Sequence, residues 1–128
     1  MNADSAAHKP RNWRDKLLVG FYGVKSAFRT EPTLWMQVIL GSIATVLSLI
    51  LGGQWVYVKQ TIFLTVAVVL AELVNTAIEY LCDLVEPKKN AKIKKTKDIL
   101  AGVVLIVSIV AISITIIDLI RILRDYYM

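Results

Sequence analysis

The chain has 128 residues, of which 56% are hydrophobic and only 20% are charged, and its mean hydropathy is +0.60. This composition is too apolar for a soluble domain of that size and predicts a small integral membrane protein. The formal net charge is +5, but the basic residues cluster beside apolar segments and no nucleic-acid motif accompanies them. We therefore expect lipid headgroups and nucleotide phosphates as partners, and no nucleic acid.

Residues 11–30 have the periodicity of an amphipathic helix. On a helical projection, one face about 80° wide collects the apolar side chains Trp13, Leu17, Phe21, Val24 and Phe28. We expect this helix to lie on the inner membrane surface, where an anchoring role without any chemistry would account for it. Pro32 disfavours helical geometry at Glu31, which predicts a break before the next segment.

Three apolar segments follow, at 33–51, 56–85 and 98–121, and each is long enough to cross a hydrocarbon layer of about 30 Å. The sequence "GGQW" (52–55) predicts a tight turn, so the second segment returns antiparallel to the first. Six Lys and Arg residues precede the first segment and six more fall within 86–98, whereas only Lys59 lies in the opposite hairpin. The N-terminus and the 86–98 loop are therefore expected in the cytoplasm. We expect residues 1–128 to form one domain.

The second apolar segment carries a polar stripe within about 100° of helical arc, formed by Glu72, Asn75, Thr76, Glu79 and Asp83. If Lys59 marks the outer boundary, Glu72 lies about 20 Å inward and Glu79 about 30 Å. An ionised carboxylate at mid-bilayer costs on the order of 2.5–3.5 kcal/mol, so Glu72 must face protein or a water-filled cleft. Three spans offer little interior for such a stripe, which predicts a homo-oligomer.

Two interpretations of these acids remain open. Asp83 and Glu86 need only emerge into water and pair with the lysines that follow. Glu72 instead indicates a functional site, either a proton or cation pathway or a catalytic site at the level of the lipid headgroups. The basic segment "EPKKNAKIKKTKD" (86–98) favours catalysis, because lysines bind phosphate and carboxylates hold Mg²⁺. Membrane topology explains most of these lysines, but it does not require the Lys97–Asp98 pair beside the span.

The sequence contains no GxxxxGK[ST], GxGxxG, HRD or DFG signature of the soluble nucleotide-binding folds. However, "AELVNTAIEYLCDLVEP" (71–87) and "KKTKDILAGVVLI" (94–106) closely resemble the small bacterial diacylglycerol kinase and undecaprenol kinase family. The stretch "GVKSAFRTE" (23–31) resembles the N-terminal section of that family more loosely. The combination of these motifs is highly specific.

The resemblance implies an all-α membrane protein: a homotrimer of three-span subunits, each with a surface helix. Such a protein transfers the γ-phosphoryl group of Mg-ATP to a membrane lipid hydroxyl, on the cytoplasmic side of the bacterial inner membrane. Carried over by motif, Glu72 is the general base and Glu79 a metal ligand. The expected nucleotide site comprises Asn75, Glu79, Lys88, Lys89, Asn90, Lys97 and Asp98.

Departures from the family pattern affect the metal and the lipid. Lys25 stands where the enterobacterial form has an acidic metal ligand, which leaves Glu31 as the expected second ligand. The stretch "EPT" (31–33) differs from the pattern of many undecaprenol kinases, and "KKN" (88–90) differs from the usual loop of the family. Undecaprenol is nevertheless slightly favoured over diacylglycerol as substrate, because the basic loop and "AGVVL" (101–105) look less like the enterobacterial diacylglycerol form. The competing hypotheses are a non-enzymatic ion or multidrug transport subunit that uses Glu72, and a structural membrane adaptor.

Overall fold

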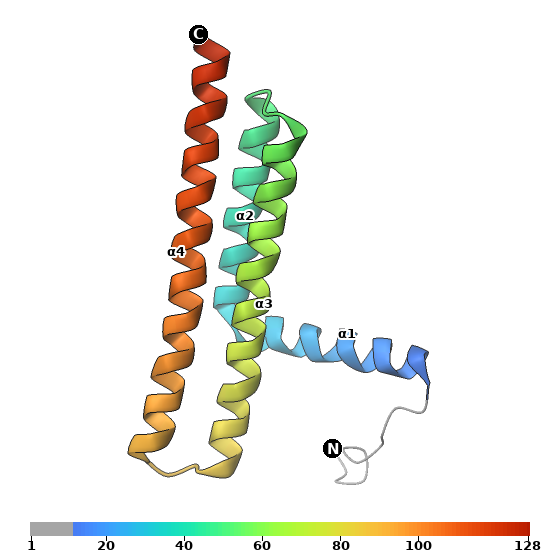
Figure 1. Ribbon diagram of the computed structural model, residues 1–128. Helices are drawn as coiled ribbons and strands as arrows, with labels where there is room; N and C mark the ends of the chain where they lie inside the picture. The colour runs from blue at the N-terminus through green and yellow to red at the C-terminus, as the bar shows by residue number, and fades with distance from the viewer. Residues whose placement is uncertain (1–11) are drawn as a thin grey trace.

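The computed structural model describes residues 12–128, which form four helices joined by short turns (Figure 1). The helices are α1 (Trp13–Thr30), α2 (Pro32–Ile50), α3 (Trp55–Val85) and α4 (Ala91–Tyr127). The predicted all-helical class is thus confirmed. By length and composition, α2, α3 and α4 can each cross a membrane, so the chain is a membrane protein with three candidate spans.

Helix α1 lies crosswise to the other three helices (Figure 1). It begins where the Asn12 side chain accepts a hydrogen bond from the backbone N–H of Asp15, at 3.0 Å. It ends at Glu31, whose backbone is extended (φ −113°, ψ 99°), and Pro32 then opens α2. The predicted break is confirmed. The predicted first residue, 11, lies outside the described range, and the position of α1 on a membrane surface stays a prediction.

Helices α2 and α3 are joined by the tight turn expected at the glycine pair. Gly52 has a φ of +72°, which favours glycine, and the N–H of Gly53 donates to the carbonyl of Ser48 at 2.8 Å. A Cβ atom at Gly53 would lie only 2.7 Å from that same carbonyl oxygen. The turn therefore requires both glycines, and it returns α3 antiparallel to α2, as expected (Figure 1).

Helix α4 extends beyond the predicted span at both ends. The sequence predicts a loop over 86–98, but α4 already begins at Ala91. The Asn90 side chain caps it by accepting from the backbone N–H groups of Lys92 and Ile93, and Ala and Lys are good helix formers. Four of the six lysines in this segment are consequently helical, and only Lys88 and Lys89 lie in the turn.

Helix α3 is the centre of the bundle, because both α2 and α4 pack along it while contacting each other far less. Much of the interior is polar: Ser48, Thr61, Glu72, Asn75, Thr76 and Asp118 are all buried. Most large apolar side chains of α2 and α4 are exposed, as expected for surfaces that meet lipid or other subunits.

Candidate active site

The centre of the candidate site is the carboxylate of Glu72 on α3, a residue that is buried with 8% of its surface exposed. Its two oxygens accept hydrogen bonds from α2. The Thr33 hydroxyl donates to Oε1 at 2.9 Å, and the Gln37 amide donates to Oε2 at 3.3 Å. Glu72 therefore faces protein, as the membrane argument required, and both oxygens are held in a fixed orientation.

The corner between α1 and α2 places these donors. Trp35 packs edge-on against Phe28, with ring centroids 5.1 Å apart, and its indole N–H donates to the Phe28 carbonyl at 2.9 Å. The Tyr80 hydroxyl donates to the Thr30 hydroxyl at 3.1 Å, which ties the end of α1 to α3. The first turn of α2 is thus fixed beside the stretch of α3 that carries Glu72.

A second group of polar side chains follows Glu72 along the same face of α3. The Asn75 amide donates to Oε1 of Glu79 at 3.2 Å, one helical turn away. The other polar atom of Asn75, Oδ1, is buried and has no hydrogen-bond partner among residues 12–128, and the same holds for the Thr76 hydroxyl. Unsatisfied buried oxygens carry an energetic cost, which a cation or a ligand donor could remove.

This donor set fits Mg²⁺, which prefers oxygen ligands and is commonly held by one or two carboxylates together with substrate phosphates. The Glu79 carboxylate and Oδ1 of Asn75 offer oxygens of this kind, and their binding of a metal stays a prediction. Within residues 12–128, no group of three or more His, Cys, Asp and Glu side chains could hold a metal by itself. Glu31 lies half-buried between α1 and α2, and its role as the second ligand stays a prediction.

The structure separates Lys97 and Asp98 into two ion pairs. Lys97 donates to Oδ1 of Asp83 at 2.5 Å and so joins α4 to α3, whereas Asp98 pairs with Lys94 on its own helix at 2.6 Å. The hydrogen bond to Asp83 raises the pKa of Lys97, which precedes the apolar part of α4, so this lysine is charged at neutral pH. The expected pairing of Asp83 with a following lysine is confirmed.

The turn between α3 and α4 carries the remaining expected nucleotide-binding residues, Lys88, Lys89 and Asn90, all of which are exposed. The Glu86 carboxylate accepts from the backbone N–H of Lys88 at 3.2 Å. The oxygen of the Asn90 side chain is used to cap α4, which leaves its amide N–H groups for a ligand. These roles stay predictions.

Sequence reasoning missed two residues of the site, the donors Thr33 and Gln37. Both are polar residues in the first two turns of an otherwise apolar helix, and their spacing of four residues places them on one helical face. That spacing was a visible signal of a polar contact. It did not identify Glu72 as the acceptor, because the rotation of α2 about its axis is a tertiary property.

The fold and the site together define a polytopic helical membrane protein with a buried carboxylate on α3 and a basic turn at the end of the same helix. Comparison with known families narrows this class. The prokaryotic diacylglycerol kinase family matches residues 19–119, and the chain belongs to this family. The family points to an ATP-dependent lipid kinase. Neither a comparison with curated proteins nor one with solved structures found a match.

Proposed function

We propose that this protein transfers the γ-phosphoryl group of Mg-ATP to the hydroxyl of a membrane lipid, at the cytoplasmic face of the bacterial inner membrane. One observation carries the proposal: Glu72 is buried and held by two donors, and Asn75 and Glu79 follow it on the same face of α3. The axial separation of Glu72 and Glu79 is about 10 Å at 1.5 Å per residue. A lipid hydroxyl and a nucleotide can therefore approach this face from opposite sides of the headgroup layer.

In the chemical step, Glu72 accepts the proton of the lipid hydroxyl while the hydroxyl oxygen attacks the γ-phosphorus. A new P–O bond to the lipid forms, and the bond between the γ-phosphorus and the bridging oxygen breaks, which releases ADP. Thr33 and Gln37 hold the carboxylate toward its substrate. A fixed base saves the entropy of orienting it at each turnover.

The nucleotide end of the site is assigned to Glu79, Asn75 and Glu31 for the metal, and to the basic residues for phosphate. When bound, Mg²⁺ neutralises charge on the transferring phosphoryl group. Lys97, Lys88 and Lys89 supply mobile cations, and Asp98 and Asn90 complete the assigned nucleotide site. Asp83 in this ion pair is exposed and Lys97 is half-buried, so a phosphate oxygen can replace Asp83 as the partner of Lys97 at small cost.

We infer further that the chain forms a single domain, 1–128, that works as a homotrimer with α1 on the membrane surface. The exposed apolar faces of α2 and α4 leave room for neighbouring subunits, which supports an oligomer. Chemical cross-linking of the purified protein tests this: a ladder that ends at three subunits is expected, and one that ends at two would contradict the trimer.

The decisive experiment supplies labelled ATP and Mg²⁺ to the purified protein in detergent, with undecaprenol and diacylglycerol assayed in parallel. Label on either lipid establishes the kinase, and we expect faster labelling of undecaprenol. Label on neither lipid would favour the transport subunit that uses Glu72 or the structural adaptor. Proton or cation flux in reconstituted vesicles that depends on Glu72 would then separate these two alternatives.

A further inference from the structure

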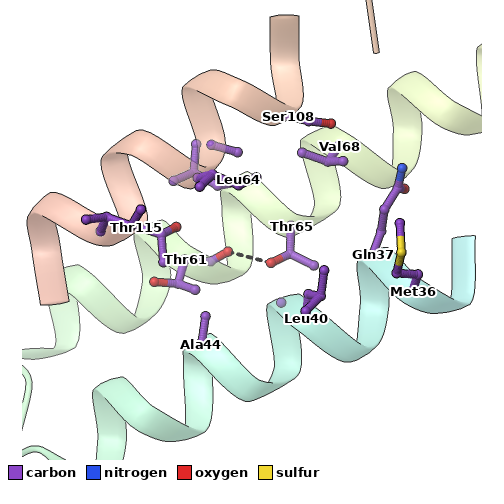
Figure 2. Close-up of a pocket in the computed structure, with 14 residues that line it drawn as sticks. Met36, Gln37, Leu40, Ala44, Thr61, Leu64, Thr65, Val68, Ser108 and Thr115 are labelled. Atoms are coloured by element: carbon purple, nitrogen blue, oxygen red, sulfur yellow. Dashed lines mark hydrogen bonds between the residues drawn. The ribbon is translucent and has the colours of Figure 1, made fainter. Parts of the chain in front are cut away.

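The cavity between α2, α3 and α4 is apolar, whereas a second cavity at the end of the bundle carries a charge. None of the described residues that line the first cavity is charged (Figure 2). Its Thr65 hydroxyl is already used, because it donates to the Thr61 carbonyl at 2.8 Å (Figure 2). The second cavity, of about 120 Å³, is lined by Asp125 and lies at the turn between α2 and α3. We call this second cavity the hairpin pocket.

The hairpin pocket lies between the α2–α3 turn and the last turns of α4. The turn contributes Gly52 and Gly53, the first turn of α3 contributes Tyr57, and α4 contributes Asp125 and Tyr126. This end of the bundle is opposite to the basic turn between α3 and α4 (Figure 1). Along α3, Tyr57 is about 22 Å from Glu72 at 1.5 Å per residue. The proposed function therefore does not involve the hairpin pocket.

The walls of the hairpin pocket are fixed by close packing. The Ile122 side chain lines the pocket, is only 4% exposed and packs directly on the turn. A Cβ atom at Gly53 would lie 2.8 Å from Cδ1 of Ile122, so α4 approaches the turn as closely as a glycine permits. A pocket that is formed before binding loses little conformational entropy when a ligand enters.

The lining of the hairpin pocket is rich in hydrogen-bond acceptors. Leu51, Gly52 and Gly53 all line it, and their carbonyls accept no backbone hydrogen bond within residues 12–128. The carboxylate of Asp125 adds two more oxygens, whereas the basic residues Lys59 and Arg121 do not line the pocket. A negative charge surrounded by acceptors favours a cation that has several N–H donors.

The size and the aromatic lining of the hairpin pocket favour an ammonium group on a short carbon chain. An apolar cavity of about 150 Å³ in another protein binds benzene, so the smaller hairpin pocket excludes a sugar ring. Tyr57 and Tyr126 supply aromatic rings, which attract organic cations. A divalent metal ion takes about six oxygen ligands and favours several carboxylates, whereas this pocket has one. A primary ammonium group has three N–H donors for the carboxylate and the turn carbonyls.

A basic side chain stands directly beside this acid. The Arg124 guanidinium lies 3.6 Å from the Asp125 carboxylate, and the two side chains are 61% and 53% exposed. Such an exposed ion pair is weak, so a ligand that carries both charges can pair with each partner. Arg124 does not line the hairpin pocket, which places its phosphate partner outside the pocket. An ammonium joined to a phosphate by a short chain has this arrangement of charges.

The hairpin pocket lies at the level expected for lipid headgroups. The candidate spans α2 and α3 end and begin at this turn, at Ile50 and Trp55. Trp55 is 72% exposed, and the exposed Tyr126 and Tyr127 end α4 at the same side of the bundle. Trp and Tyr side chains concentrate at the boundary between membrane and water. A lipid headgroup is therefore the phosphate-bearing ammonium compound that is concentrated beside the pocket.

We propose that the hairpin pocket binds the phosphoethanolamine headgroup of a membrane lipid, at the membrane surface opposite the candidate active site. The ammonium group lies in the pocket against Asp125 and the turn carbonyls, and the phosphate pairs with Arg124 outside it. Binding anchors the α2–α3 turn and the end of α4 to the same lipid. This site is independent of the proposed kinase function.

The test uses native mass spectrometry of the full chain in detergent. Three lipids with the same acyl chains are added in equal amounts: phosphatidylethanolamine, its N,N-dimethyl derivative and phosphatidylcholine. Methylation removes N–H donors and enlarges the ammonium group, while the phosphate and the chains stay the same. We expect the amount of retained lipid to fall in that order, by about fivefold or more from first to last. Equal retention of the three lipids would overturn the proposal.

A matched pair of variants tests the location of the site. Asp125→Asn removes the negative charge and keeps the shape of the side chain, so we expect it to abolish the preference for phosphatidylethanolamine over phosphatidylcholine. Asp15→Asn makes the same change on α1, outside the pocket, and should keep the preference. An unchanged preference in Asp125→Asn would refute the assignment. The comparison of lipids on the unchanged protein needs neither variant.

Two further measurements test the phosphate contact and the source of the headgroup. Arg124→Gln should lower the retention of all three lipids and keep their order, because all three carry the phosphate. Retention as high as in the unchanged protein would contradict the role of Arg124. Soluble phosphoethanolamine, added at the concentration of the lipids, should not displace the bound lipid. Displacement would identify a soluble ligand and overturn the assignment to a lipid.

Discussion

Two buried carboxylates lie toward opposite ends of the helical bundle, and their surroundings differ. Glu72 on α3 accepts hydrogen bonds at both oxygens from donors on α2. Asp118 on α4 is even less exposed, at 2%. Within the described part of the chain, its Oδ2 is buried without a partner and its Oδ1 has only the Arg121 guanidinium at 3.7 Å. Burial of an acid is therefore not what distinguishes the candidate site.

The two carboxylates differ in the groups that lie near them. Beyond Glu72 lie a potential metal ligand, a buried amide oxygen without a partner and a charged lysine, whereas the described partner of Asp118 is an arginine on its own helix. An intramembrane acid indicates function by default, but a catalytic role needs groups that act on a substrate. We therefore propose that Glu72 carries the chemistry and that Asp118 takes no part in it.

The largest expected effect is a loss of kcat on substitution of Glu72, which tests the proposed role of this carboxylate. Glu72→Gln removes the proton acceptor while keeping the shape of the side chain, so we expect kcat to fall by about 10²–10⁴. ATP binding, measured by equilibrium dialysis, should change little because a base acts in the chemical step. Equal losses in turnover and in ATP affinity would contradict the assigned role.

A smaller loss is expected at the metal end. Glu79→Gln removes a carboxylate ligand, and the Mg²⁺ concentration that gives half-maximal activity should rise roughly tenfold or more, in line with the 10–100-fold effects of weakening a metal site. The measurement is a Mg²⁺ titration at fixed ATP. Asp125→Asn, an exposed acid on α4 at the other end, is the control and should leave the Mg²⁺ requirement unchanged.

Loss of either hydrogen-bond donor on α2, Thr33 or Gln37, should lower kcat less than loss of the Glu72 carboxylate that they hold. A hydrogen bond to a charged group contributes about 1.5–3 kcal/mol, so Thr33→Val or Gln37→Leu should lower kcat by roughly 10–100-fold. Thr33→Ser keeps the hydroxyl and should restore most of the activity. In a Glu72→Gln background neither substitution should lower kcat further, and additive losses there would show that the donors act by another route.

Substitutions at Lys97 and Asp83 test whether Lys97 binds a phosphate of the nucleotide. Lys97→Gln should raise KM for ATP severalfold and leave kcat nearly unchanged, because a phosphate contact is lost outside the chemical step. Asp83→Asn removes the ion-pair partner but keeps the lysine, so KM for ATP should hold or fall. A rise in KM of the same size in both variants would show that the ion pair itself is what the protein needs.

The smallest effect is expected at the other buried acid. Asp118→Asn should keep kcat within about threefold and should hold or raise the thermal midpoint, because a buried carboxylate oxygen without a partner is itself unfavourable. Thermal unfolding followed by circular dichroism measures the second quantity. A loss of activity comparable to that of Glu72→Gln in folded protein would break the comparison.

Much of the architecture follows from local sequence patterns. Hydropathy identified the three apolar helices, the pair Gly52–Gly53 marked the turn, and Pro32 marked the break before α2, since each depends on neighbouring residues alone. The length of α4 was underestimated for a related reason. Its first turns are polar and so suggested a loop, although the Asn90 cap was visible in the sequence.

Some features of the candidate site likewise follow from the sequence, and others depend on the tertiary structure. The sequence by itself determined that Glu72, Asn75 and Glu79 share one face of α3, because helical periodicity fixes the angle between residues of a single helix. Only the tertiary structure decided that Thr33 and Gln37 hold Glu72, that Lys97 reaches Asp83, and that Asp118 is buried. These contacts depend on how each helix is rotated and shifted against the next, and a periodic pattern in one helix carries no information about that register.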